Sequence, residues 1–130
     1  MVEFATKPLP QKPDVTAPDG SDVRILLELK NGGMAHFELP PGKISIAVAH
    51  RTVEEIWYII SGQGEMWRKQ GNREEIASLA PGVTLTIPQG THFQFRAHNS
   101  EPLCAIAITM PPWPGPDEAY RVQGKWKPRT

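Results

Sequence analysis

The sequence is poor in three features that would argue against a simple soluble domain: cysteines, long apolar runs and an excess of charge of one sign. Its single cysteine, Cys104, can form no internal disulfide, and it lies in the apolar run 103–108, where a small buried side chain is expected. No stretch of about eighteen apolar residues occurs, and the first residues lack the apolar segment of a signal peptide. Fourteen basic residues balance fourteen acidic ones. We therefore expect a cytoplasmic protein with no general attraction to membranes or nucleic acids.

The chain also lacks any amphipathic helical pattern of useful length, and its 14 prolines divide it into three zones. Four prolines before residue 20, without periodicity, predict an extended N-terminal arm over residues 1–22. The run Pro-Pro-Trp-Pro-Gly-Pro after residue 110 predicts a proline-rich and aromatic tail over residues 111–130. Residues 23–110 between them are expected to form one domain with a modest core.

Residues 23–110 consist of short apolar segments separated by glycine, proline and asparagine. The expected strands are 23–29, 34–39, 44–49, 56–61, 64–68, 76–79, 85–87, 93–97 and 103–110. Many short strands with turn residues between them predict an all-β fold, either an antiparallel sandwich or a barrel.

Two segments with regularly spaced glycines carry the most specific signal. The first contains Gly42, His50, Glu55 and Gly62, and the second contains Gly82, Pro88 and Gly90. Their spacing resembles the two motifs of the cupin family, G-x5-H-x-H-x3,4-E-x6-G and G-x5-P-x-G-x2-H-x3-N. The resemblance implies an antiparallel double-stranded β-helix, a jelly-roll barrel whose mouth holds the site.

In the cupin family, two histidines and a glutamate of the first motif and a histidine of the second bind a metal ion. Here His50 and Glu55 match two of these positions, while Val48 and Phe93 stand at the other two. His92 lies one residue before the second-motif position. The resemblance nominates His50, Glu55 and His92 as ligands of a divalent transition metal such as Fe, Mn, Ni, Cu or Zn. Glu55 is also the candidate catalytic acid or base.

Two arrangements of the second motif are open. If the loop after Gly90 is one residue shorter than in the family, His92 turns inward and completes a three-ligand site. If the register is kept, Phe93 takes the ligand's place, and it points inward together with Phe95. The second arrangement gives a regular alternation of apolar inward and polar outward residues. A bulge at the barrel rim could nevertheless re-aim His92.

Alternation along the strands also predicts the wall of a small-molecule pocket. The residues expected in this wall are Ile46, Val48, Trp57, Trp67 and Phe93. Two functions from different classes follow. One is a mononuclear metal-dependent enzyme of dioxygenase, isomerase or lyase type acting on a small substrate. The other is a non-catalytic, metal-free module that senses or carries a small ligand.

The two end segments contain aromatic residues, which rarely remain free in solvent. Phe4 lies in the arm, and Trp113 and Trp126 lie in the tail. Small cupins commonly dimerise, so the resemblance implies a homodimer, and we expect an end segment to contribute to its contact.

Overall fold

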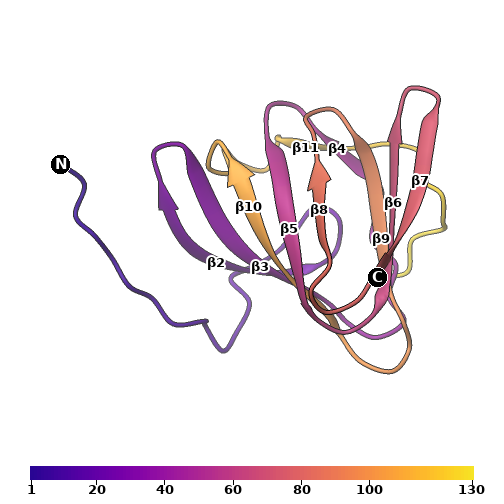
Figure 1. Ribbon diagram of the computed structural model, residues 1–130, viewed down its shortest axis with the longest axis horizontal. Helices are drawn as coiled ribbons and strands as arrows, with labels where there is room; N and C mark the ends of the chain where they lie inside the picture. Colours follow the sequence, from indigo (N-terminus) through magenta and orange to yellow (C-terminus); the bar gives the residue numbers. More distant parts are fainter.

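The computed structural model describes residues 1–130 and contains strands but no helix (Figure 1). The strands are β1 (Val15–Thr16), β2 (Asp22–Leu29), β3 (Gly32–Leu39), β4 (Val48–His50), β5 (Glu54–Ser61), β6 (Gly64–Gln70), β7 (Arg73–Leu79), β8 (Thr84–Ile87), β9 (His92–Ala97), β10 (Leu103–Met110) and β11 (Ala119–Arg121). The chain accordingly has no helix that is long and apolar enough to cross a membrane.

The strands form two sheets that enclose the core (Figure 1). The six-stranded sheet has the order β1-β2-β3-β10-β5-β8, and the five-stranded sheet has the order β11-β4-β9-β6-β7. All pairings are antiparallel, and strands far apart in sequence, such as β3 and β10, lie side by side. This arrangement confirms the predicted all-β jelly roll.

Alternation along β5 and β9 fills the space between the sheets. Trp57 and Ile59 of β5 are buried, whereas their neighbours Tyr58 and Ile60 are exposed on the other face of the sheet. Side chains from both sheets join one core of fourteen buried residues. The half of this core farther from the start of β5 is filled by Ile59, Met66, Leu79, Phe95, Leu103 and Ala105. We call this half the packed end of the barrel.

The glycines of the two motifs lie in turns, as their spacing predicts. Gly42, Gly62, Gly82 and Gly90 all have positive φ. Gly62 is the most constrained, because its φ is 81° and a Cβ placed there would lie 2.1 Å from the carbonyl oxygen of Pro102. Only glycine fits such a left-handed turn against a neighbouring backbone.

One expected strand is shorter than predicted. The segment 44–49 pairs as a strand only from Val48, where β4 begins. Before it, Ile44 forms isolated bridges with Arg96 and Arg129, and the amide of Ile46 donates to the carbonyl of Asp19. The two ends of the chain therefore satisfy backbone groups that the prediction assigned to a continuous strand.

The C-terminal segment is bound to the five-stranded sheet through one buried amide. The amide nitrogen of Gln94 donates to the carbonyls of Ser45 and Trp126, both at 2.8 Å. Its amide oxygen accepts from the backbone of Lys125 and Trp126, both at 2.9 Å. The ring of Trp126 also packs under the guanidinium of Arg96, 4.1 Å from the ring centroid. These contacts hold the tail on its own barrel.

The N-terminal segment follows the edge of the six-stranded sheet. β1 pairs with β2, and the guanidinium of Arg24 donates to the carbonyls of Pro10 and Gln11. Phe4, by contrast, is fully exposed. The boundaries expected at residues 22 and 111 thus leave β1 and β11 outside the zone predicted to form the barrel. The homodimer stays a prediction.

Candidate functional site

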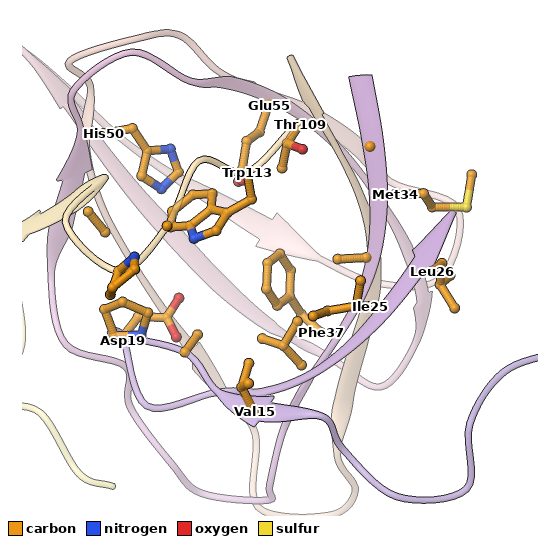
Figure 2. A pocket seen from close by; sticks show the side chains of 18 of the residues that line it. Val15, Asp19, Ile25, Leu26, Met34, Phe37, His50, Glu55, Thr109 and Trp113 are labelled. Atoms are coloured by element: carbon orange, nitrogen blue, oxygen red, sulfur yellow. The ribbon is translucent and has the colours of Figure 1, made fainter. Parts of the chain in front are cut away.

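A cavity of about 520 Å³ occupies the end of the barrel where β5 and β9 begin (Figure 2). It is lined by β2, β3, β4, β5, the start of β9, the end of β10, the chain around residues 15–19 and the chain around residues 113–119. The aromatic residues of its lining are Phe37, Trp57, Phe93 and Trp113, besides His50. We call this half of the molecule the cavity end.

Three polar side chains gather on one side of the cavity, while Asp19 lies near Val15 in another part of its lining. Figure 2 shows His50, Glu55 and Thr109 near one another on one side, with Trp113 beside them. Ile25 and Met34 lie on the other side, in the β2–β3 hairpin. The space is therefore suited to a molecule with an apolar body and one polar end.

Glu55 is a buried carboxyl group in the wall. It lies near the start of β5, opposite Thr109 of β10, and is 2 % exposed. One of its oxygens accepts a hydrogen bond of 2.8 Å from the indole nitrogen of Trp57. Burial raises the pKa of Glu55 to about 7; the bond from Trp57 counteracts this, and the charges of Asp19 and Glu118 add to it. Near neutral pH this carboxyl is present in both protonation states.

His50 ends β4 and is held between two aromatic rings. Its ring centroid lies 5.1 Å from that of Phe93 and 5.1 Å from that of Trp113, edge-on in both cases. The side chain is 4 % exposed, and its Nδ1 has no hydrogen-bond partner in the protein. Burial lowers the pKa of His50 to about 4, against an opposing effect of Glu118. The imidazole is therefore neutral at physiological pH, with one buried nitrogen unsatisfied.

Two more carboxyl groups lie close to this pair. Asp19 lines the cavity, and one of its oxygens accepts from the backbone and hydroxyl of Ser21 at 2.9 and 2.6 Å. Burial nonetheless raises the pKa of Asp19. Burial acts the same way on Glu118, but hydrogen bonds from Thr52 and Val53 outweigh it and lower the pKa of Glu118. Glu118 is therefore an ionised carboxylate beside the cavity.

The pKa values of His50 and Glu55 are in inverted order. Between pH 4 and pH 7 the imidazole is unprotonated and the carboxyl of Glu55 holds a proton, because burial disfavours the charged form of each. One group can therefore accept a proton while the other donates one. Such a separation is typical of acid–base pairs in enzymes, and it equally provides a hydrogen-bond acceptor and donor for a ligand.

The residues nominated as metal ligands do not form a metal site. Phe93 points into the cavity, whereas His92 precedes it on β9, opposite Lys69 of β6, and does not line the cavity. Nowhere in the chain do three or more His, Cys, Asp or Glu side chains come together to hold a metal ion. Since Val48 also lines the cavity at a ligand position, apolar side chains replace half of the family's ligands. The donor set does not fit a metal ion bound in the family's manner.

Two residues expected in the pocket wall lie elsewhere. Trp67 follows the inward-pointing Met66 on β6, so it faces the opposite side of the sheet, where it lies opposite Gln94 and donates to Glu74 at 2.7 Å. Ile46 precedes β4 and packs against the core without lining the cavity. The prediction is corrected for these two residues, whereas Val48, Trp57 and Phe93 do line the cavity.

Sequence reasoning missed lining residues from outside the predicted barrel. Asp19 belongs to the segment expected as an arm, and Trp113 to the segment expected as a tail. A signal existed for each: Asp19 begins an Asp-Gly-Ser turn, and Trp113 is an aromatic residue within a proline-rich run. Phe37 was predicted in a strand but not in the pocket; it stacks on Trp57 with ring centroids 5.1 Å apart.

Comparison with known proteins agrees with this architecture. Over 92 % of its length the chain is similar in structure to CapF from Staphylococcus aureus, a capsular polysaccharide assembling protein (TM-score 0.73, 15 % identity), but it spans only 35 % of that protein. A protein with a double-stranded β-helix domain from Klebsiella pneumoniae is similar over 94 % of this chain and 100 % of its own (TM-score 0.69, 17 % identity). KdgF from Halomonas sp. is similar over 75 % of this chain and 85 % of its own (TM-score 0.64, 18 % identity).

These similarities show the fold, since the identities are low. None of the curated proteins compared with the chain matches it. The family model described as "Cupin domain" matches residues 35–109, more than half of the 130 residues. This match covers both glycine motifs, all of β4 to β9 and most of β3 and β10, and it includes His50, Glu55 and Phe93. The chain therefore belongs to the cupin family.

Proposed function

We propose that this cupin binds a small, largely apolar organic molecule in the cavity, without a metal ion in the family's position. The observation that carries the proposal is the cavity of about 520 Å³, in which Val48 and Phe93 occupy two ligand positions. A space of this size accommodates a molecule with one or two rings. Its polar side offers His50 and Glu55, while most of its wall offers aromatic and aliphatic contacts.

The placement of His50 supports this proposal. Its imidazole lines the cavity and is neutral at physiological pH, because burial lowers its pKa to about 4. A neutral imidazole has one N–H donor and one unprotonated nitrogen that accepts a hydrogen bond. A ligand with a hydrogen-bonding group can therefore be recognised by His50 without meeting a second charge.

Binding of a neutral fluorescent probe tests the proposal. N-phenyl-1-naphthylamine, which brightens in apolar surroundings, is expected to bind with a stoichiometry of one per chain. Ala35→Leu adds bulk to the cavity wall and is expected to weaken this binding at least tenfold. Ala77→Leu, at another half-buried alanine that does not line the cavity, is the control and leaves binding unchanged. Absence of saturable binding would overturn the proposal.

Elemental analysis of untagged protein tests the second half of the proposal. We expect well below one transition-metal ion per chain. If a stoichiometric first-row metal copurifies and His50→Ala removes it, the metal-dependent enzyme expected from the sequence takes the place of this proposal.

A second candidate function is metal-free proton transfer, of isomerase or lyase type. It is favoured by the inverted pKa values of His50 and Glu55. His50 would take a proton from a carbon next to a carbonyl group, and Glu55 would donate one to the carbonyl oxygen. Exchange of the α-hydrogens of 1-indanone with D2O is then expected to be catalysed between about pH 4 and 7. Catalysis unchanged in Glu55→Gln would refute this role.

A further inference from the structure

We infer that the natural ligand of the cavity is an organic cation, an apolar ring system or chain carrying a protonated amine, with the amine against Glu55. The inference rests on the proposed small-molecule binding and adds the chemical class of the ligand. Its basis is the set of charged groups around the cavity, the aromatic wall and the neutral imidazole of His50.

The charged groups around the cavity are all of one sign. Carboxyl groups come from three lining residues, namely Asp19, Glu28 of β2 and Glu55 of β5. A fourth, Glu118, lies just before β11 and acts on both His50 and Glu55. No lysine or arginine lines the cavity. A bound anion would therefore meet repulsion with no counter-charge, whereas a bound cation would be attracted from several sides.

The nearest loop arginine does not change this balance. Arg51 follows His50 in sequence, but its guanidinium lies 4.7 Å from the ring centroid of Tyr120. Its Nε donates to the carbonyl of Asp117 at 3.0 Å, and the side chain does not line the cavity. Glu55 thus has a single hydrogen-bond partner, the neutral indole of Trp57. The protein therefore places no positive charge beside Glu55, and a cationic ligand would supply one.

The acceptors on the polar side suit an ammonium group. Such a group has three N–H donors and no acceptor. The side facing Trp113 offers the carboxylate of Glu55, the hydroxyl of Thr109 directly across from it on β10, and the neutral imidazole of His50. His50 is neutral above about pH 4, so one of its two ring nitrogens is unprotonated and can accept a hydrogen bond. An amine thus finds a charged partner and neutral acceptors together.

The aromatic wall adds to the preference for a cation. Phe37, Trp57, Phe93 and Trp113 line the cavity, and the faces of such rings attract cations. The same rings provide apolar contact area for the body of the ligand. An apolar amine would therefore gain both the attraction of its charge to the rings and the apolar contacts of its body.

Binding of a cation should also release a proton. In the free protein, burial holds the pKa of Glu55 at about 7, so much of this carboxyl is protonated below neutral pH. A cation placed beside it stabilises the carboxylate and lowers its pKa. Asp19 and Glu28 also line the cavity, the charge of Glu118 acts on Glu55 from beside it, and His50 stays neutral above about pH 4. With the amine against Glu55, this carboxyl is the group expected to lose the proton; burial also raises the pKa of Asp19, and the variant Glu55→Gln distinguishes the two groups.

Three probes with the same naphthalene body test the inference: 2-(1-naphthyl)ethylamine, 2-(1-naphthyl)ethanol and 1-naphthylacetate. Their affinities are measured by displacement of N-phenyl-1-naphthylamine at pH 8. We expect the amine to bind at least tenfold more tightly than the alcohol, and the carboxylate to bind most weakly. Titration calorimetry at pH 6.5 in buffers of different ionisation enthalpy should show proton release for the amine only.

Two variants locate the effect. Glu55→Gln is expected to abolish the preference for the amine over the alcohol and the proton release. Glu54→Gln changes the exposed neighbouring carboxylate and should leave both unchanged. If the alcohol binds as well as the amine, or better, the cation inference is refuted while the proposed binding function stands. If none of the three probes displaces the fluorescent probe, the inference is refuted, and absence of binding by that probe itself refutes the proposed function.

Discussion

The two ends of the barrel use the same strands in opposite ways. At the packed end, β5 and β9 contribute Ile59 and Phe95, which are almost fully buried among apolar side chains. At the cavity end the same strands contribute Glu55 and Phe93, and the neighbouring β4 contributes His50. A step of two residues along β9, or of four along β5, therefore changes the environment from a filled core to the wall of a cavity.

This contrast indicates that the two ends of one small domain have different roles: the packed end stabilises the fold, and the cavity end forms the candidate site. Burial of Glu55 and His50 costs free energy, as the displaced pKa values of both groups show. The packed end supplies the apolar burial that offsets this cost. Such unfavourable burial of ionisable groups is typical of functional sites, and it is tolerated where the rest of the fold compensates for it. Changes at the two ends should therefore affect stability and binding differently.

The largest effect is expected at the packed end. Ile59→Ala removes a side chain that is 0 % exposed and leaves a cavity in the core, so it should lower the free energy of unfolding by about 2–5 kcal/mol. Ile60→Ala makes the same change at the next residue, which is 42 % exposed on the opposite face, and should cost less than about 1 kcal/mol. Urea denaturation measures both. Equal losses would mean that the two faces of β5 do not differ as described.

At the cavity end, replacement of a buried acid should stabilise the protein at high pH. The pKa of Glu55 is raised from 4.5 to about 7, so its proton is favoured in the folded state, and stability is lost as the pH rises from 4.5 through 7. Glu55→Gln removes this loss and should be more stable than the wild type at pH 8, by up to roughly 3 kcal/mol. Near pH 4 the difference should vanish.

His50 has the opposite pH dependence, which sharpens this test. Its pKa is lowered from 6.5 to about 4, so stability is lost as the pH falls from 6.5 through 4. In the wild type the two effects oppose each other between about pH 4.5 and 6.5. In Glu55→Gln the effect of His50 is no longer opposed by that of Glu55, so stability should rise more with pH over that window than it does in the wild type. Glu54→Gln should follow the wild-type curve, and urea midpoints across pH 4–8 decide between these outcomes.

Much of the fold and part of the cavity end could be predicted from the sequence. Glycine spacing and apolar alternation are local signals, and they gave the jelly roll, the turn at Gly62 and the inward direction of Trp57. The alternation of Phe93 and Phe95 also favoured the arrangement that the structure has. The competing metal site rested on His92, whose position one residue earlier places it on the other face of β9.

What the sequence did not predict depends on contacts between distant segments. Asp19 and Trp113 reach the cavity because both ends of the chain pair with the barrel, through β1 and β11. Short strands of two or three residues have too little pattern to be recognised. The pKa of Glu55 likewise depends on burial by residues from several elements. The sequence shows that residue 55 is a glutamate, whereas the pKa of Glu55 is set by its surroundings in the folded chain.

A moderate effect is expected from the amide that holds the tail. Gln94→Ala removes the partner of two backbone carbonyls and two backbone N–H groups, and its side chain is 0 % exposed. We expect a loss of about 1–3 kcal/mol in unfolding free energy and faster cleavage of residues 122–130 by protease. Gln63→Ala, at an exposed glutamine, is the control. Unchanged cleavage in Gln94→Ala would show that other contacts hold the tail.

Of these variants, Trp113→Ala is expected to have the smallest effect on stability, together with a marked effect on ligand binding. Its ring packs edge-on against His50 but is 38 % exposed, so Trp113→Ala should lower the unfolding free energy by less than about 1 kcal/mol.

Removal of this ring opens the polar side of the cavity to water. Affinity for N-phenyl-1-naphthylamine should fall at least fivefold, and the pKa of His50, followed by NMR, should rise from about 4 towards its ordinary value because burial is its main cause. Trp126→Ala removes a half-buried tryptophan that packs on Arg96 away from the cavity, and it should change neither quantity. If Trp113→Ala behaved like Trp126→Ala, the tail would not be part of the binding site, and the wall of the cavity end would be built by the barrel strands and the N-terminal segment alone.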